Sequence, residues 1–384
     1  MQGSIKRVKE GVYRLRYDAG IDAATGKRRQ PMVTFRGKRE AAEKKLRDLV
    51  SAVENGTYVE ASKMTLGQWL TDWIEVIKPR VRPATYDRYK GIIDNTISKA
   101  PIATLSIQKL RPLHIETFYA NVTAVSASTK TLYHNVINSA LRKAVRDRLI
   151  PSNPARDLEA RPRRSRGKSE DARQHCWTVT EAQKFLDAAN AAGPQPAAFY
   201  GVALHTGMRK GELCGLTWAD VDFDTRKVRV VRSLSKGFVG EDGKPVFGPT
   251  KTGRVRTVTI DHHTADLLRV HRAAQREDKM AQGPAYREHG LVFAREDGKP
   301  LLINNLGQRE YAGLIKAAGV KPIKFHGMRH TCATLMLQAG QPVQVVSERL
   351  GHAKVSMTLE VYAHVLPDMQ SEAADALGAL LQRR

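Results

Sequence analysis

Five polar side chains of this 384-residue sequence have the types and the order expected of a reaction centre. They are Arg209, His326, Arg329, His352 and Tyr362. Arginine guanidiniums match the non-bridging oxygens of a phosphate and stay charged while a pentavalent transition state forms. A tyrosine can be a nucleophile when a neighbour accepts its proton, because its unperturbed pKa is about 10. The set therefore predicts metal-free attack on a phosphodiester.

Each of these side chains stands in or near a short motif. Arg209 lies in TGMRKGEL, Arg329 lies in HGMRH, and His352 ends LGH, ten residues before Tyr362. In these motifs, their order and their spacing, the chain resembles the tyrosine recombinase family, and phage integrases in particular. The resemblance is specific over residues 177–367.

The resemblance implies a role for each side chain. Arg209 and Arg329 would hold the phosphate, and His352 would donate to a non-bridging oxygen. His326 would accept the phenolic proton or hydrogen-bond the phosphate. Tyr362 would attack DNA to give a 3′-phosphotyrosyl link and a free 5′ hydroxyl. A single histidine in such a position is usually a satisfied core or capping residue, and helix capping is the alternative for His352.

A general acid is also required to protonate the leaving 5′ oxygen. In the family this is a lysine on a β-hairpin, commonly in Lys-Thr followed shortly by an arginine. Lys251-Thr252 before Arg254 fits that pattern. Lys236 and Lys244 lie on the same predicted hairpin and remain alternatives.

Other polar residues near the motifs have supporting or competing interpretations. Glu212 follows Arg209 by three positions and is expected to buttress it. His330 is a candidate for a supporting role beside the phosphate. Tyr286 and Tyr311 are rival nucleophiles, but neither follows an LGH motif.

The implied reaction sets the expectation for cofactors. The phosphodiester bond energy would be kept in the covalent link, so neither ATP nor another cofactor is expected. The motifs contain no carboxylate cage, so no metal is expected either.

The charge of the chain favours a polyanionic partner. Lys and Arg number 63 against 39 Asp and Glu, which gives a formal charge of +24. The three cysteines, Cys176, Cys214 and Cys332, lack paired spacing, which argues against a disulfide framework and favours a reducing cytosol. No signal peptide or membrane span is indicated. These features favour the cytoplasm, and the resemblance to phage integrases implies a nucleoid-associated protein of a bacterial host.

Residues 1–60 predict a small β-sheet followed by a helix. Residues 11–17 alternate at the period of a strand, residues 28–35 form a second strand, and residues 39–53 carry apolar side chains at helical spacing. This region has 14 basic against 8 acidic residues. The resemblance implies a domain that binds distant arm sites on DNA; a basic surface of unknown purpose is the alternative.

Residues 64–155 predict a compact all-helical domain. Thr65 is expected to cap a helix with an apolar stripe that includes Trp69 and Trp73, and further helical patterns run over residues 86–97, 112–121 and 128–148. The family resemblance, which here holds in outline, implies a core-binding domain. The basic segment 156–176 lacks helical or strand periodicity and is expected to be a linker.

Residues 177–384 predict the catalytic domain and a C-terminal tail. A capping box at Thr180–Gln183 is expected to start a helix, and strands are expected at residues 227–232 and 254–260, with turns between them. In the tail, apolar residues recur at helical spacing. The resemblance implies that this tail docks on a neighbouring copy; packing on its own domain is the alternative.

The expected fold class is therefore multi-domain α+β. It comprises a small N-terminal sheet-plus-helix domain, an all-helical core-binding domain and a mainly helical catalytic domain with a small antiparallel sheet.

The expected function is site-specific recombination that integrates or excises a phage or mobile element, without metal or ATP. A type IB topoisomerase-like relaxing enzyme and a non-catalytic DNA-binding regulator are the alternatives. Expected partners are core and arm attachment sites in double-stranded DNA and further copies of the chain in a homotetramer. A host DNA-bending protein and a directionality factor are further candidates, and no membrane is expected.

Overall fold

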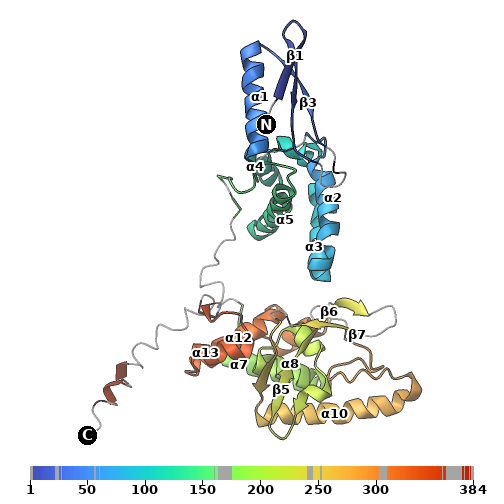
Figure 1. Ribbon diagram of the computed structural model, residues 1–384. Coiled ribbons are helices and arrows are strands. Elements are labelled where there is room, and N and C mark those ends of the chain that lie inside the picture. Colours follow the sequence, from blue (N-terminus) through green and yellow to red (C-terminus); the bar gives the residue numbers. More distant parts are fainter. Residues whose placement is uncertain are drawn as a thin grey trace. The chain divides into compact units, whose positions relative to one another are not determined.

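The chain forms two compact units, Met1–Ser165 and Arg166–Arg384, in the computed structural model (Figure 1). The structure describes residues 3–359, 374, 375, 377–379 and 381, with gaps at residues 22–25, 27, 56–57, 60, 160, 163–174, 240–244, 251–252, 302–308 and 357. Helices dominate, and the strands form small antiparallel sheets. This agrees with the expected α+β class.

The first unit begins with an antiparallel sheet covered by a helix. Its elements are β1 (Gly3–Lys9), β2 (Val12–Tyr17), β3 (Met32–Arg36) and α1 (Arg39–Glu54), with strand order β1-β2-β3. Leu15 and Tyr17 on β2 pack with Ala42 and Leu46 on α1 in a small core. The strand β1 was missed by the sequence analysis, because nearly all of its side chains are exposed and it therefore has no apolar alternation.

The remainder of the first unit is helical, as expected. Its elements are α2 (Leu66–Ile77), η1 (Lys78–Arg80), α3 (Pro83–Ile92), the π-helix η2 (Ile93–Ile97), η3 (Pro101–Thr104), η4 (Ile107–Lys109), α4 (Pro112–Asn121) and α5 (Ala127–Arg146). Thr65 caps α2 in a reciprocal capping box with Gln68. Trp69 and Trp73 are buried in a core separate from that of the sheet, as expected for the apolar stripe to which they belong.

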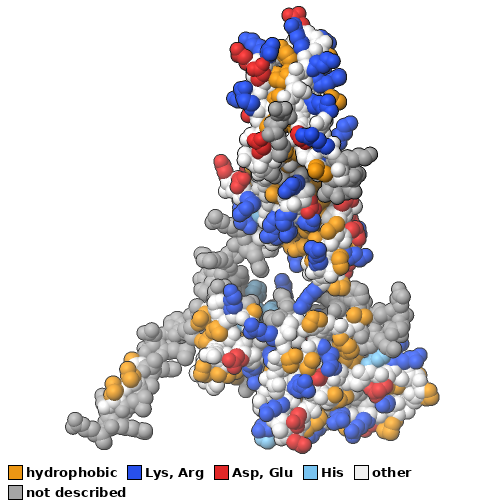
Figure 2. Space-filling view, viewed as in Figure 1, with side chains coloured by type: hydrophobic (Ala, Val, Ile, Leu, Met, Phe, Trp, Pro, Cys, Tyr) orange, Lys and Arg blue, Asp and Glu red, His pale blue; other side chains and the backbone are white. Residues whose placement is uncertain are grey.

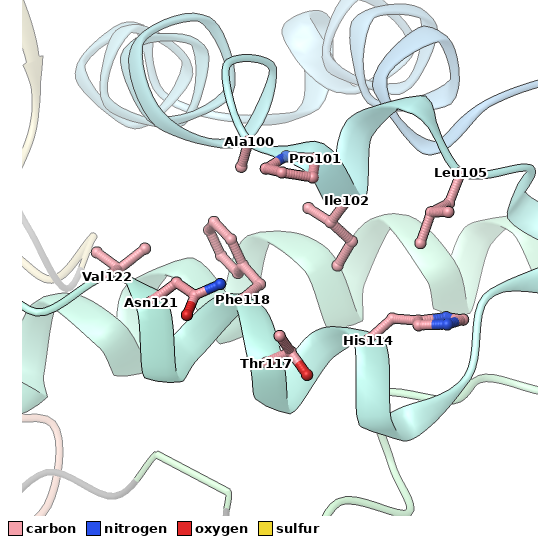
Figure 3. Close-up of a pocket in the computed structure, with 9 residues that line it drawn as sticks. All are labelled: Ala100, Pro101, Ile102, Leu105, His114, Thr117, Phe118, Asn121 and Val122. Atoms are coloured by element: carbon pink, nitrogen blue, oxygen red, sulfur yellow. The ribbon is translucent and has the colours of Figure 1, made fainter.

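A pocket of about 320 Å³ opens between η3 and α4 (Figure 3). Phe118 on α4 points toward Pro101 and Ile102 on η3, so most of the lining is apolar. All of the lining residues belong to the first unit.

The second unit has helices around two small sheets. Its elements are α7 (Val179–Ala191), α8 (Pro194–Thr206), α9 (Lys210–Cys214), η5 (Trp218–Asp220), β4 (Val221–Asp222), β5 (Lys227–Val230), β6 (Arg232–Val239), β7 (Pro245–Pro249), β8 (Arg256–Thr259), α10 (His262–Gln282), η6 (Gly283–Ala285), α11 (Glu310–Ala318), α12 (Phe325–Gln338) and α13 (Val343–Leu350). The sheets have strand orders β4-β5-β8 and β6-β7. The largest core cluster joins α7, α8, α11 and the β5-β8 strands.

Two local predictions for this unit were wrong. The capping box is formed by Thr178 with Glu181, two positions before the predicted Thr180, because Thr178 is the residue that has extended backbone just before the helix. Residues 245–249 form β7, although the sequence analysis placed only turns between the two predicted strands. Pairing with β6, rather than an apolar pattern of its own, accounts for that strand.

Candidate active site

Arg209 lies in the tight turn between α8 and α9. Gly207 ends α8 with a φ of 62°, in the left-handed region that glycine adopts without strain. A Cβ at this position would lie 2.4 Å from the Leu350 side chain, so space as well as backbone angle requires glycine. The turn places Arg209 at the N-cap of α9, with 19% of its side chain exposed.

Glu212 holds Arg209 in place, as the sequence analysis expected. Arg209 Nη1 donates to Glu212 Oε1 over 2.9 Å, and the backbone N–H of Arg209 donates to Glu212 Oε2 over 3.0 Å. The Glu212 side chain is 1% exposed. Burial alone would raise the pKa of Glu212, but the hydrogen bond and charge of Arg256 and the interactions with Arg209 hold that pKa below its usual value. Glu212 is therefore a buried carboxylate shared by two arginines.

Arg256 on β8 is the second partner of Glu212, and the sequence analysis missed it. Its Nη2 donates to Glu212 Oε2 over 2.8 Å, and its Nε donates to the carbonyl of Arg349 over 3.0 Å. A Cβ at Gly351 would lie 2.9 Å from the Arg256 side chain. Arg256 thus connects β8 to α9 and to the end of α13.

Arg329 lies in the second turn of α12 and is 4% exposed. Its Nη1 donates to the carbonyl of Gly207 over 2.7 Å, which joins α12 to the turn that carries Arg209. His326 lies three residues earlier on α12, on the same helix face. The rings of His326 and His330 meet edge to face, with centroids 5.0 Å apart.

His352 follows the end of α13. Gly351 has a φ of 68°, and the backbone N–H of His352 donates to the carbonyl of Ser347 over 3.1 Å. The imidazole instead lies 2.7 Å, through Nδ1, from Thr358 Oγ1. It is therefore the backbone of His352, and not its side chain, that caps the helix.

The arginines and histidines of this region act electrostatically on the imidazole of His352. Burial, together with the smaller effects of the charges of Arg329, Arg209, His330 and His326, lowers the pKa of His352 to about 4. Residues of α9, α12 and the turn after α13 thus act on a single imidazole, which is neutral at physiological pH. The structure brings together Arg209, Arg329, His326 and His352.

Arg349 is another residue that the sequence analysis missed. Its Nε and Nη2 both donate to the carbonyl of His205, over 3.2 and 2.8 Å. It precedes the LGH motif directly, and this position beside a motif was the available signal. Arg349 ties the end of α13 to the end of α8.

The remaining predicted residues lie outside the described part of the chain. These are Lys251, Tyr362 and Lys244, together with the side chain of Lys236, whose backbone is on β6. The two predicted strands do pair in antiparallel fashion, as β5 with β8, and the stretch between them contains the further antiparallel pair β6-β7.

The two rival tyrosines have other surroundings. Tyr311 is 3% exposed and packs among the rings of Trp177, Phe185 and Tyr200 as a core residue. Lys279 lies over the ring of Tyr286, with its Nζ 5.9 Å from the centroid. Burial raises the pKa of both phenols, which opposes their use as nucleophiles.

The described residues contain neither a disulfide nor a cluster of side chains suited to a metal ion. All three cysteines are buried free thiols, as their spacing indicated. Within the described residues, no three His, Cys, Asp or Glu side chains are grouped so that they could hold a metal ion. No helix in the same part of the chain combines the length and apolar character of a membrane span.

Comparison with known proteins identifies the family. The model of the phage integrase family matches residues 177–369, which is half of the chain, and the model of the phage integrase N-terminal SAM-like domain matches residues 65–122. The chain belongs to the phage integrase family. It is a tyrosine recombinase of the phage-integrase type, and its function is site-specific recombination of DNA.

Curated relatives and solved structures agree with this assignment. A tyrosine recombinase XerC-like protein of Caldanaerobacter subterraneus subsp. tengcongensis is 30% identical over 90% of this chain and 91% of that protein. The ICEBs1 integrase of Bacillus subtilis is 27% identical over 98% of this chain and its own whole length.

The solved structures show the fold. The Tn1549 transposon integrase in complex with transposon right end DNA has a TM-score of 0.64 at 21% identity and covers 82% of this chain and 100% of its own. A lambda integrase dimer bound to a core site has a TM-score of 0.54 at 19% identity and covers 93% of this chain and 94% of its own. The integrase fold of the chain is therefore supported over both units.

Proposed function

We propose that the active site of this recombinase consists of Arg209, Lys251, His326, Arg329, His352 and Tyr362. The observation that carries the proposal is the convergence of two arginines and two histidines around the turns that end α8 and α13. The arginines are held by a buried carboxylate and by backbone carbonyls, so their guanidiniums are oriented before DNA binds. Such a preorganised pair suits a phosphate better than a small neutral substrate.

The proposed reaction is a transesterification without net change in bond type. The phenolic oxygen of Tyr362 attacks the phosphorus, and His326 accepts the phenolic proton. The bond to the 5′ oxygen breaks, and Lys251 gives that oxygen a proton. A 5′ hydroxyl of the partner strand then attacks the 3′-phosphotyrosyl link and releases the tyrosine. Arg209 and Arg329 supply the positive charge that the transition state needs, so the scheme requires neither metal nor ATP.

A nicked suicide DNA that carries the attachment sequence tests this site. The wild-type chain, with chelator present, should form a protein–DNA adduct that survives denaturation. Tyr362→Phe should bind the DNA and form no adduct, whereas the matched control Tyr286→Phe should form it at the wild-type rate. An adduct at the wild-type level in Tyr362→Phe would refute the assignment of the nucleophile.

The N-terminal sheet is proposed to bind arm sites, within a domain of residues 1–60. Lys6 pairs with Arg14 across β1 and β2, and Val12 pairs with Arg36 across β2 and β3. Because Leu15 faces α1, the alternation of the strand puts Arg14 on the opposite, exposed face. Figure 2 shows basic side chains gathered over this end of the first unit. A basic sheet face of this kind fits the major groove, which admits β-strands.

The arm proposal is tested by two pairs of substitutions with equal change in charge. Arg14→Ala with Arg36→Ala should remove protection of distal arm sites in a footprint and leave core protection intact. Lys44→Ala with Arg47→Ala, exposed on α1, should leave both footprints unchanged. Equal loss of arm protection in the two double variants would refute a role for the sheet face.

The remaining domains and partners complete the proposal. Residues 64–155 bind the core site, residues 156–176 form a basic linker along the duplex, and residues 177–384 carry the chemistry. Four copies would act on two duplexes in the integration or excision of a phage or mobile element. A host DNA-bending protein and a directionality factor would join this complex, which would form in the bacterial cytoplasm.

A further inference from the structure

We propose that Thr358 is a positioning residue that holds the proton of His352 on Nε2, the nitrogen that would donate to the scissile phosphate. The inference rests on the role given to His352 in the proposed function. It adds a residue that touches neither DNA nor the reacting atoms and acts through the imidazole.

The Thr358 hydroxyl is buried against the imidazole of His352. Thr358 is 0% exposed, and its Oγ1 lies 2.7 Å from His352 Nδ1. Thr206 and Thr331, which are also buried, donate their hydroxyl protons to a carbonyl four residues back in their own helices. Among the described residues, the Thr358 hydroxyl meets His352 Nδ1 and no such carbonyl. A hydroxyl so deeply buried must give its proton to an acceptor, because an unmet buried donor is costly.

The bond to Thr358 determines which ring nitrogen of His352 carries the proton. If Nδ1 accepts the threonine proton, a neutral imidazole must carry its own proton on Nε2. The ring is neutral, since burial and the nearby charges lower the pKa of His352 to about 4. The opposite arrangement, with Nδ1–H donating to Oγ1, would leave the hydroxyl proton without an acceptor in the described part of the chain.

The positive charges around His352 make a positioning residue necessary. The positive charges of Arg329 and Arg209 lower the pKa of His352, so they favour a lone pair over an N–H on a ring nitrogen turned toward them. A lone pair there would repel a phosphate oxygen, whereas an N–H would donate to it. The bond from Thr358 opposes this tendency and also fixes the plane of the ring. Neither effect can be supplied by an apolar side chain of the same shape.

The kinetic test uses the full chain, saturating protein and the nicked suicide DNA. Thr358→Val should slow adduct formation about tenfold without weakening DNA binding, and Thr358→Ser should stay within about threefold of wild type. Thr264→Val removes an equally buried hydroxyl at the start of α10 and should have the wild-type rate. A wild-type rate for Thr358→Val would overturn the proposal.

A double-mutant cycle separates positioning from a merely structural effect. In the His352→Gln background, Thr358→Val should lower the rate of adduct formation by less than about twofold, because the imidazole through which Thr358 acts is then absent. The same tenfold loss in both backgrounds would overturn the inference while the role of His352 stands.

Nitrogen chemical shifts of the imidazole provide a readout that is independent of catalysis. The ¹⁵N spectrum of His352, assigned by its absence in His352→Gln, should show an unprotonated Nδ1 in the wild-type chain and a changed tautomer in Thr358→Val. A protonated Nδ1 in the wild-type chain would refute the inference alone. A wild-type cleavage rate for His352→Gln would instead refute the proposed role of His352 in the reaction.

Discussion

At the scale of single residues, the shape of the guanidinium matters at position 329 as much as its charge. Arg329 is almost fully buried and gives one N–H to the carbonyl of Gly207 over 2.7 Å. A planar fork can do this and still present other N–H groups to a phosphate, whereas the three N–H groups of a lysine ammonium radiate from one nitrogen and cannot reproduce that spacing. We therefore expect Arg329→Lys to lose about a hundredfold in the rate of adduct formation.

The measurement is single-turnover cleavage beside an electrophoretic shift assay of DNA binding. Arg269→Lys changes an arginine on α10 whose side chain is 51% exposed and should keep the wild-type rate. Cleavage by Arg329→Lys within about threefold of wild type would show that charge alone suffices.

The general acid can be identified by changing the leaving group of the DNA. Lys251→Ala should be slow on ordinary DNA, because the departing 5′ oxygen then lacks a proton donor. Replacing that bridging oxygen by sulfur, which leaves without protonation, should restore most of the rate. Lys236→Ala and Lys244→Ala provide matched controls on the hairpin. If sulfur fails to rescue Lys251→Ala, or rescues a control variant to the same extent, the role belongs to another residue.

The sequence motifs predicted some residues of the candidate site and missed others. The motifs identified the arginines and histidines that converge, since their types and order carry the chemistry. They could not identify Arg256, because its bonds to Glu212 and Arg349 join positions 44 and 93 residues apart. Only the folded chain brings such positions together, and an arginine in a strand pattern is otherwise typical of a surface.

At the scale of elements, the Glu212 carboxylate holds α9 and β8 in a fixed relation. Glu212→Gln would leave two arginines beside a neutral amide at a buried site. We therefore expect the substitution to lower the free energy of unfolding by about 3 kcal/mol. Because the pKa of Glu212 is lowered in the folded chain, its stabilising effect is present above its ordinary pKa of 4.5 and is lost as the pH falls below that value. The stability difference between wild type and Glu212→Gln should therefore shrink at acid pH in chemical denaturation.

A control for this prediction is Asp266→Asn. Asp266 pairs with Arg269 on the surface of α10, and its loss should change stability by less than about 1 kcal/mol. An equal effect of the two substitutions, or a difference for Glu212→Gln that grows toward acid pH, would contradict the role assigned to Glu212.

The elements themselves were predictable where local signals agreed. Thr65 and the apolar stripe behind it located α2, and Pro112 located the start of α4. The signals failed where pairing decides the structure, as in β1, whose polar residues become a strand by bonding to β2. They also failed at α7, where two threonines stand two positions apart and each has an acidic or amide residue three positions later.

At the scale of the whole molecule, the two cores of the first unit predict separable DNA contacts. The sheet and α1 share one core, and α2 to α5 share another. A chain that starts near Ser62 should keep the core footprint and lose the arm footprint. The full chain with Arg14→Ala and Arg36→Ala is the control for misfolding of the shortened protein. Unchanged protection of distal sites by the shortened protein would contradict the division.

The carbonyl bonds of the arginines have a consequence for thermal behaviour. Arg209 and Arg329 donate to the neutral oxygens of Gly351 and Gly207, so the folded chain keeps its guanidiniums oriented before any nucleic acid arrives. An inorganic oxyanion that settles between them would bind the native state and scarcely the unfolded one. At ten times its dissociation constant, such an anion would add about 1.4 kcal/mol to the stability. Sulfate should therefore raise the melting temperature of the wild-type chain more than that of Arg329→Lys at equal ionic strength. Thermal melting would then detect an anion in the proposed phosphate site without any DNA.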